Sequence, residues 1–215
     1  TPLAKESVAD LDLETELLKD PEAIALYRSN TMRCGYLSQD RPDLCIPVRE
    51  LAKGMKEPTM RHFGILKRMS RYLAARPRLV QLFRFQESMR YIDAWTDSNH
   101  ANCIRTRKSA TGVATMIGKN CIRAYTKGQG VIALSSGEAE YYGLTSGMSS
   151  VLGDVSMAKD WGIGLIPRCL LDATAGIAIG SRRGLGKVKH IDTVFLWCQE
   201  KVNSGAVTLL KRGTK

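Results

Sequence analysis

The chain has 215 residues, of which 44% are hydrophobic and 25% are charged, with 19 Gly and 7 Pro. This composition excludes a disordered, collagen-like or low-complexity chain, and the length allows a substantial hydrophobic core. The formal net charge is +11. The first 20 residues hold six acidic residues and two lysines, a net charge of −4, so residues 21–215 carry +15. That excess favours a polyanionic partner, with nucleic acid ahead of an acidic membrane.

Two features of the chain indicate the kind of environment in which the protein is found. No run of about 18 apolar residues occurs, so the sequence predicts no membrane span. The six cysteines form no C-x-x-C pair and have no histidine at zinc-site spacing, and we therefore expect free thiols in a reducing, intracellular compartment. The chain begins without an initiator Met or a signal-peptide core, and we expect it to be part of a longer protein.

The first part of the chain is predicted to be helical. Residues 1–20 are acidic, and we expect them to be a mobile segment. A helical pattern with few helix-breaking residues then covers 21–32, and apolar residues recur at helical spacing in 48–55 and 60–75. Asp20 and Pro21 supply an N-cap and a first-turn proline for the first of these helices. Residues 21–80 are therefore predicted to form a small helical segment.

The pattern changes after Pro77 to short runs that are typical of strands. These runs cover 79–85, 91–96, 112–117 and 121–126. A helix is predicted next, followed by a strand, two more helices and a last strand, at 135–152, 169–171, 173–180, 190–203 and 207–210. This order predicts an α/β domain with a mixed sheet, in which antiparallel hairpins come first and a parallel strand follows the helical crossover.

Three acidic residues occupy positions at which α/β domains commonly carry functional side chains. Asp97 and Asp172 directly follow predicted strands, and Glu140 lies near the start of the helix between them. Three ionised carboxylates about 5 Å apart would repel one another by roughly 3 kcal/mol per pair, so such a cluster favours bound divalent cations. The alternative from spacing alone is that Asp97 caps a turn and Asp172 caps the following helix.

Two glutamates compete for the third position, and their spacing separates them. Ser135 and Glu138 have the spacing of a capping box, in which Glu138 folds back onto the backbone amide of Ser135. Glu140 lies beside the apolar stripe of the same helix, where a carboxylate has no structural role. We therefore predict that Glu140 is the chemical residue and that Glu138 is the cap.

Several motifs, in this order along the chain, resemble one family. Residues 21–80 contain Arg41-Pro42-Asp43 and Lys67-Arg68-Met69-Ser70-Arg71-Tyr72-Leu73, and the later motifs are Trp95-Thr96-Asp97-Ser98, Thr106-Arg107-Lys108-Ser109-Ala110-Thr111-Gly112, Ala133-Leu134-Ser135-Ser136-Gly137-Glu138-Ala139-Glu140-Tyr141 and Lys189-His190-Ile191-Asp192. The later motifs resemble the ribonuclease H domain of Ty1/copia-type retrotransposon Pol polyproteins. Residues 21–80 resemble the C-terminal tail of the reverse transcriptase that precedes this domain.

The resemblance implies a fold and an activity. It implies an RNase H-like mixed five-stranded sheet flanked by helices over 81–215, preceded by the connection-like helical segment at 21–80. The implied activity is hydrolysis of the RNA strand of RNA–DNA hybrids with two Mg²⁺ ions, with Mn²⁺ as a substitute. Asp97, Glu140 and Asp172 would be the catalytic, metal-binding acids, and a fourth acid would lie beyond Lys215. The implied partners are the hybrid and the rest of the polyprotein, with the reverse transcriptase upstream, in cytoplasmic virus-like particles or the nucleus.

Basic and hydroxyl residues near these acids are predicted to contact the nucleic acid. They are Ser98, Arg107, Lys108, Ser136, Arg182, Arg183, Lys187, Lys189 and His190. The chain also departs from the family pattern, because Asn99 and His100 replace an Asp and a Trp, and Ala173 and Thr174 follow Asp172 in place of Asn and Gln. These departures leave an alternative, a catalytically inactive, diverged remnant that still binds nucleic acid.

Overall fold

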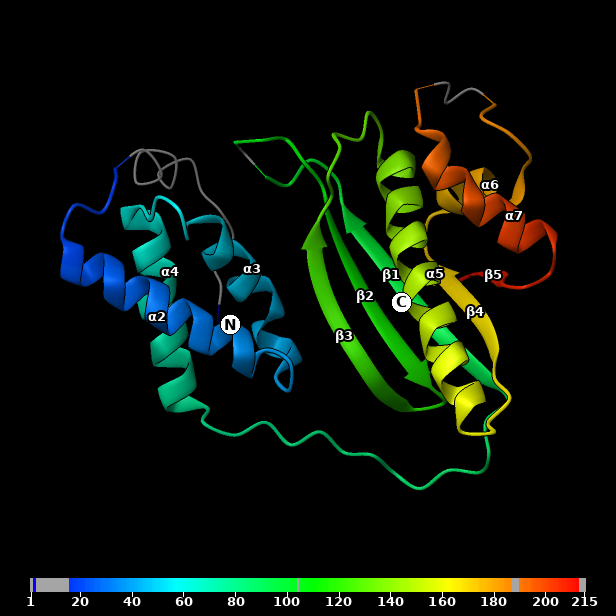
Figure 1. Ribbon diagram of the computed structural model, residues 1–215, viewed down its shortest axis with the longest axis horizontal. Coiled ribbons are helices and arrows are strands. Elements are labelled where there is room, and N and C mark those ends of the chain that lie inside the picture. The colour runs from blue at the N-terminus through cyan, green and yellow to red at the C-terminus, as the bar shows by residue number, and fades with distance from the viewer. Residues whose placement is uncertain (1, 3–15, 104, 187–189, 213–215) are drawn as a thin grey trace. The chain divides into compact units, whose positions relative to one another are not determined.

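The computed structural model describes residues 2, 16–103, 105–186 and 190–212, and the chain divides into two compact units, Thr1–Gln81 and Leu82–Lys215 (Figure 1). Each unit has its own cluster of buried apolar side chains. The acidic segment predicted at 1–20 lies mostly outside the described residues. None of the helices in the described ranges is long and apolar enough to cross a membrane.

The first unit is helical. It contains α2 (Pro21–Leu37), the short 3₁₀ helix η1 (Pro42–Leu44), α3 (Cys45–Lys53) and α4 (Met60–Ala75). The Asp20 side chain accepts hydrogen bonds from the amides of Glu22 and Ala23, as expected for the N-cap of α2. The helices pack around Tyr27, Leu44, Leu51, Ile65, Leu66 and Met69. These side chains fill one small core, which holds the three helices together.

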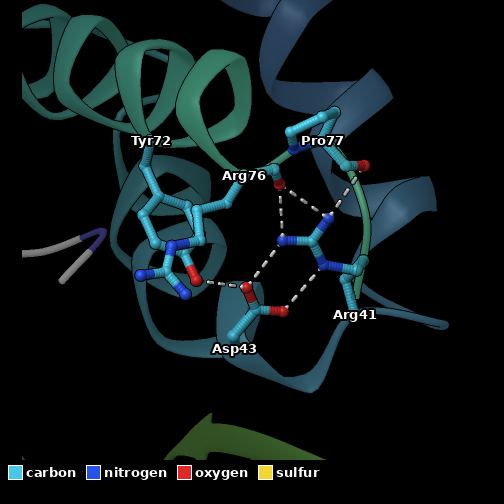
Figure 2. Close-up of polar contacts among 5 residues, drawn as sticks. All are labelled: Arg41, Asp43, Tyr72, Arg76 and Pro77. Atoms are coloured by element: carbon cyan, nitrogen blue, oxygen red, sulfur yellow. Dashed lines mark hydrogen bonds and ion pairs between the residues drawn. The ribbon is translucent and has the colours of Figure 1, made fainter. Parts of the chain in front are cut away.

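A buried arginine fixes the end of this helical unit (Figure 2). The Arg41 guanidinium donates to both carboxylate oxygens of Asp43, at 3.0 and 2.8 Å, and to the carbonyls of Arg76 and Pro77, each at 3.3 Å. The Tyr72 hydroxyl donates to Asp43 at 2.8 Å. Hydrogen bonds from Arg41, with a smaller contribution from Tyr72, lower the pKa of Asp43. Because Arg76 is the C-cap of α4, this network satisfies carbonyls at the helix end and sets where the chain leaves it.

The second unit is built on one mixed sheet. Its strands are β1 (Tyr91–Asn99), β2 (Ala110–Ile117), β3 (Asn120–Gly128), β4 (Ile166–Leu171) and β5 (Thr208–Lys211), in the spatial order β3-β2-β1-β4-β5. The β1–β2 and β2–β3 pairs are antiparallel, whereas β1–β4 and β4–β5 are parallel. The predicted mixed five-stranded sheet, with a helical segment before it, is therefore confirmed.

One predicted strand is wrong. Residues 79–85 form no strand, and their apolar side chains are exposed, with Phe85 at 99%. The apolar residues of this run stand in adjacent pairs, Leu79 with Val80 and Leu82 with Phe83, rather than alternating. A strand with one buried face needs alternation, so the run has no single side to bury.

Helices pack against the sheet, and α5 lies close to β1 (Figure 1). The helices are α5 (Ser136–Asp160), α6 (Thr174–Ser181) and α7 (Trp197–Asn203), with the 3₁₀ helix η2 (Thr193–Leu196) before α7. A Cβ at Gly147 on α5 would lie 2.2 Å from Thr96 Cγ2, so glycine is required there. The predicted helix at 190–203 is shorter than expected, since residues 190–192 are not helical and η2 precedes α7. The close contact brings the start of α5 against the end of β1, where the acidic residues lie.

Candidate functional site

The structure brings the three predicted acids together. Asp97 lies on β1, Glu140 in the second turn of α5, and Asp172 directly after β4. Each offers one carboxylate oxygen, and these oxygens all lie within 4.8 Å of one another. β1 continues to Asn99, so Asp97 lies inside the strand rather than after it, which corrects the predicted end at Thr96. The parallel β1–β4 register pairs Trp95 with Leu170. Continued by two residues, the same register places Asp97 beside Asp172.

The three carboxylates differ in exposure, and Glu140 is the buried one. Asp97 and Asp172 are exposed, whereas Glu140 is 4% exposed. Burial, with smaller contributions from the charges of Asp97 and Asp172, raises the pKa of Glu140 from 4.5 to about 7. The Ser98 amide donates to Glu140 Oε1 at 3.1 Å and partly opposes this shift.

This environment fits a divalent cation. Glu140 Oε2 is buried and has no hydrogen-bond donor among the described residues. A buried carboxylate oxygen without a partner is costly, and a cation would satisfy it. All three side chains offer only oxygen, which is the donor set that Mg²⁺ and Mn²⁺ prefer. Asp97, Glu140 and Asp172 could therefore hold such ions together.

Glu138 makes different contacts, and its predicted capping role needs a correction. The Ser135 hydroxyl accepts from the Glu138 amide at 3.2 Å, as expected, but the Glu138 carboxylate accepts from the amide of Leu134 at 3.0 Å rather than from Ser135. It also accepts from the Tyr142 hydroxyl at 2.7 Å and lies 2.8 Å from His190 Nε2. Burial opposes ionisation, but these hydrogen bonds outweigh it and lower the pKa of Glu138.

The loop between β1 and β2 carries two of the predicted nucleic-acid contacts. Arg107 is exposed and has a positive φ of 55°, while Lys108 is half-buried. Ser136, at the start of α5, is exposed. Ser98 is half-buried, and its hydroxyl donates to the carbonyl of Ala139 at 3.0 Å. Arg107 and Ser136 are thus open to a ligand, whereas Ser98 is held against α5.

The second basic cluster, in 182–190, is only partly open. Arg183 is exposed. Arg182 is half-buried, and its guanidinium donates to the carbonyl of Leu185. The His190 side chain is 45% exposed and contacts Glu138. Lys187 and Lys189 lie outside the described residues. Within the described part of the cluster, Arg183 is the cation best placed to meet a phosphate.

Gln129 lies at the site but was not predicted from the sequence. Its side chain is buried, and its amide contacts Thr111 and Ala139. The residue stands between two glycines, a pattern that indicates a turn. In the structure, residue 129 lies four positions after Tyr125, whose hydroxyl contacts Ser150 on α5, but nothing in the sequence shows that this side of β3 faces the helix.

Comparisons with known proteins give distant relatives. No protein-family model matches the chain. The uncharacterized mitochondrial protein AtMg00810 of Arabidopsis thaliana is 36% identical over 118 residues, which cover 55% of this chain and 49% of that protein. The retrovirus-related Pol polyprotein from transposon RE2 of the same plant is 28% identical over 217 residues, which cover 100% of this chain and 15% of the polyprotein. The chain thus spans half or less of these relatives.

A likeness also exists among solved structures. LC11-RNase H1, isolated from compost by a metagenomic approach, is 15% identical to this chain, with a TM-score of 0.40. The match covers 58% of this chain and 86% of that protein.

Proposed function

Since this chain is homologous to the retrovirus-related Pol polyproteins of transposons, we propose that its second unit is a ribonuclease H domain that hydrolyses the RNA strand of RNA–DNA hybrids. The observation that carries the proposal is the meeting of Asp97, Glu140 and Asp172, whose ligand oxygens lie within 4.8 Å of one another. The net charge of +15 on residues 21–215 suits a nucleic-acid substrate.

The acids would hold two Mg²⁺ ions, or Mn²⁺ in their place. Bound divalent cations would activate the attacking water and stabilise the leaving 3′-oxygen. Without cations, each ionised pair about 5 Å apart is unfavourable by roughly 3 kcal/mol at an effective dielectric constant near 20. Glu140 is fixed by the Ser98 amide and by burial, while Asp97 and Asp172 face solvent at the point where a substrate would arrive.

Basic residues on both sides would bind the hybrid through its phosphates. Arg107 and Lys108 would act from the β1–β2 loop, and Arg183 from the segment after α6. Ser98, Ser136, Arg182, Lys187, Lys189 and His190 complete the proposed set. The RNA strand would be distinguished by its 2′-hydroxyls across the minor groove of the hybrid.

The same homology supports a proposal about the larger protein. The helical unit would be the end of the reverse transcriptase, so that the hybrid passes from polymerisation to hydrolysis within one polyprotein. We place this polyprotein inside the cell, in virus-like particles or the nucleus.

A cleavage assay tests the proposal. The RNA strand of a hybrid is end-labelled and incubated with the protein in Mg²⁺ or Mn²⁺, with a DNA duplex of the same sequence as the substrate control. We expect cleavage of the RNA strand alone, and its loss in Asp172→Asn. The matched control is Asp160→Asn, which changes an exposed carboxylate at the far end of α5. Equal cleavage by both variants would refute the assignment of the acids.

The second candidate, an inactive nucleic-acid-binding remnant, rests on the residues after Asp172. Ala173 is the N-cap residue of α6 and provides no side-chain hydrogen bond to the helix in the described structure. Salt-sensitive hybrid binding without cleavage in either metal would favour this candidate.

A further inference from the structure

The side chain of Gln129 joins three elements at the candidate site. It follows β3 and is 7% exposed. Its Nε2 donates to Thr111 Oγ1 on β2 at 2.9 Å and to the carbonyl of Ala139 on α5 at 2.8 Å. It also lies 3.4 Å from Ser98 Oγ on β1. One buried amide therefore contacts β1, β2 and α5.

Two of these contacts are next to metal-site acids in the chain. Ser98 directly follows Asp97, and Ala139 directly precedes Glu140. The Ser98 hydroxyl also donates to the Ala139 carbonyl at 3.0 Å, and the Ser98 amide donates to Glu140 Oε1 at 3.1 Å. The backbone that carries Asp97 is thus tied to the backbone that carries Glu140, and Gln129 donates to the shared carbonyl.

A glycine provides the space for this arrangement. A Cβ at Gly143, one turn after Ala139 on α5, would lie 2.5 Å from Ser98 Oγ and 3.6 Å from Thr111 Cγ2. A larger residue would force the serine and the helix apart. The local packing therefore brings Ser98, Thr111 and Ala139 close enough for a single amide to reach all three.

The charges of the site act against this spacing. Ionised Asp97 and Glu140 repel each other, and the repulsion acts to separate β1 from the start of α5. A neutral donor that holds the two backbones resists the separation without adding a charge. We propose that Gln129 is a positioning residue that fixes Asp97 and Glu140 at the spacing required for divalent cations. This inference rests on the proposed function for the role of the cations, and on the contacts above for the role of the amide.

The first test compares metal affinities. Mn²⁺ binding is measured by calorimetry for the unaltered chain, Gln129→Met and Gln199→Met. Gln199 is the matched control because it is also buried, at 5% exposed, but its amide contacts Ile179 and Gly184. We expect about tenfold weaker binding in Gln129→Met, as for other residues that orient metal ligands, and less than about a twofold change in Gln199→Met. Equal losses in both variants, or no loss in Gln129→Met, would overturn the proposal.

The second test needs no metal. Hydrogen exchange of the Ser98 amide reports the bond to Glu140 directly. We expect exchange about tenfold faster in Gln129→Met and unchanged in Gln199→Met, and unchanged exchange in both would overturn the positioning role. Gln129→Asn, whose amide is too short to reach the same partners, is expected to behave like Gln129→Met and replaces it if that variant does not fold. If the unaltered chain binds no Mn²⁺, the proposed function fails, and Ser98 exchange still decides whether Gln129 positions the acids.

Discussion

Replacing Glu140 with Gln should stabilise the metal-free protein at neutral pH and abolish metal binding. The carboxylate is 4% exposed, and its pKa rises from 4.5 to about 7 because of burial and the nearby charges of Asp97 and Asp172. A group whose pKa is raised on folding holds its proton more tightly in the folded state. The stability it contributes is therefore complete below pH 4.5 and is lost as the pH rises through about 7.

The size of the effect follows from the shift. A rise of this size corresponds to at most about 3 kcal/mol of free energy of unfolding. Relaxation of the site and water at the exposed Asp97 and Asp172 reduce both the cost of burial and the repulsion, which leaves about 1–2 kcal/mol. Gln cannot ionise, so Glu140→Gln should raise Tm by roughly 3–6 °C at pH 8 and leave it nearly unchanged at pH 4.

Thermal unfolding at both pH values, with and without Mn²⁺, checks this reasoning. Added Mn²⁺ should raise the Tm of the unaltered chain and leave that of Glu140→Gln in place, because a cation stabilises only the state that binds it. Glu138→Gln serves as the control. The Glu138 carboxylate accepts hydrogen bonds from Leu134 and Tyr142, so its removal should lower the Tm of the protein. A metal-free Glu140→Gln protein less stable than the unaltered chain at pH 8 would refute the argument.

Three further predictions concern other parts of the chain. Arg183→Ala should weaken hybrid binding and reduce the slope of log affinity against log salt by about one, measured by fluorescence anisotropy. Gly147→Ala should lower the free energy of unfolding by about 2 kcal/mol or more in urea titrations, because its Cβ would overlap Thr96. Asp43→Asn should cost the helical unit about 3 kcal/mol, because it leaves the buried Arg41 without its carboxylate. Since the pKa of Asp43 is lowered, the stability from this pair should be present above pH 3.8 and lost as the pH falls further.

The sequence predicted those parts of the fold that depend on local patterns. The helix of Glu140 begins where the Ser135 cap indicates, and Asp172 directly follows a strand, because caps and apolar periodicity act over a few residues. The convergence of the three acids also followed, since parallel strands end at one edge of a sheet.

Contacts between distant segments were harder to predict. Glu138 was assigned a cap within its own helix turn, yet it also contacts His190, which is 52 residues away. Gln129 contacts Ser98, which lies 31 residues earlier. Neither pairing leaves a spacing signal in the sequence, because it depends on how far α5 approaches the sheet. The run at 79–85 shows the opposite error, because its strand-forming residues join none of the strands in the described part of the chain.

The parallel pairing of β1 with β4 has a consequence for how the chain folds. Side chains alternate between the two faces of a strand, so a slip of β4 by one residue would turn the positions around Asp172 to the opposite side of the sheet. The three acids also lie far apart in the chain, at 97, 140 and 172, so the cluster cannot form until β4 has been synthesised and has paired in this register. Mn²⁺ binding during refolding would therefore report one long-range event, the correct alignment of two strands joined by more than 60 residues.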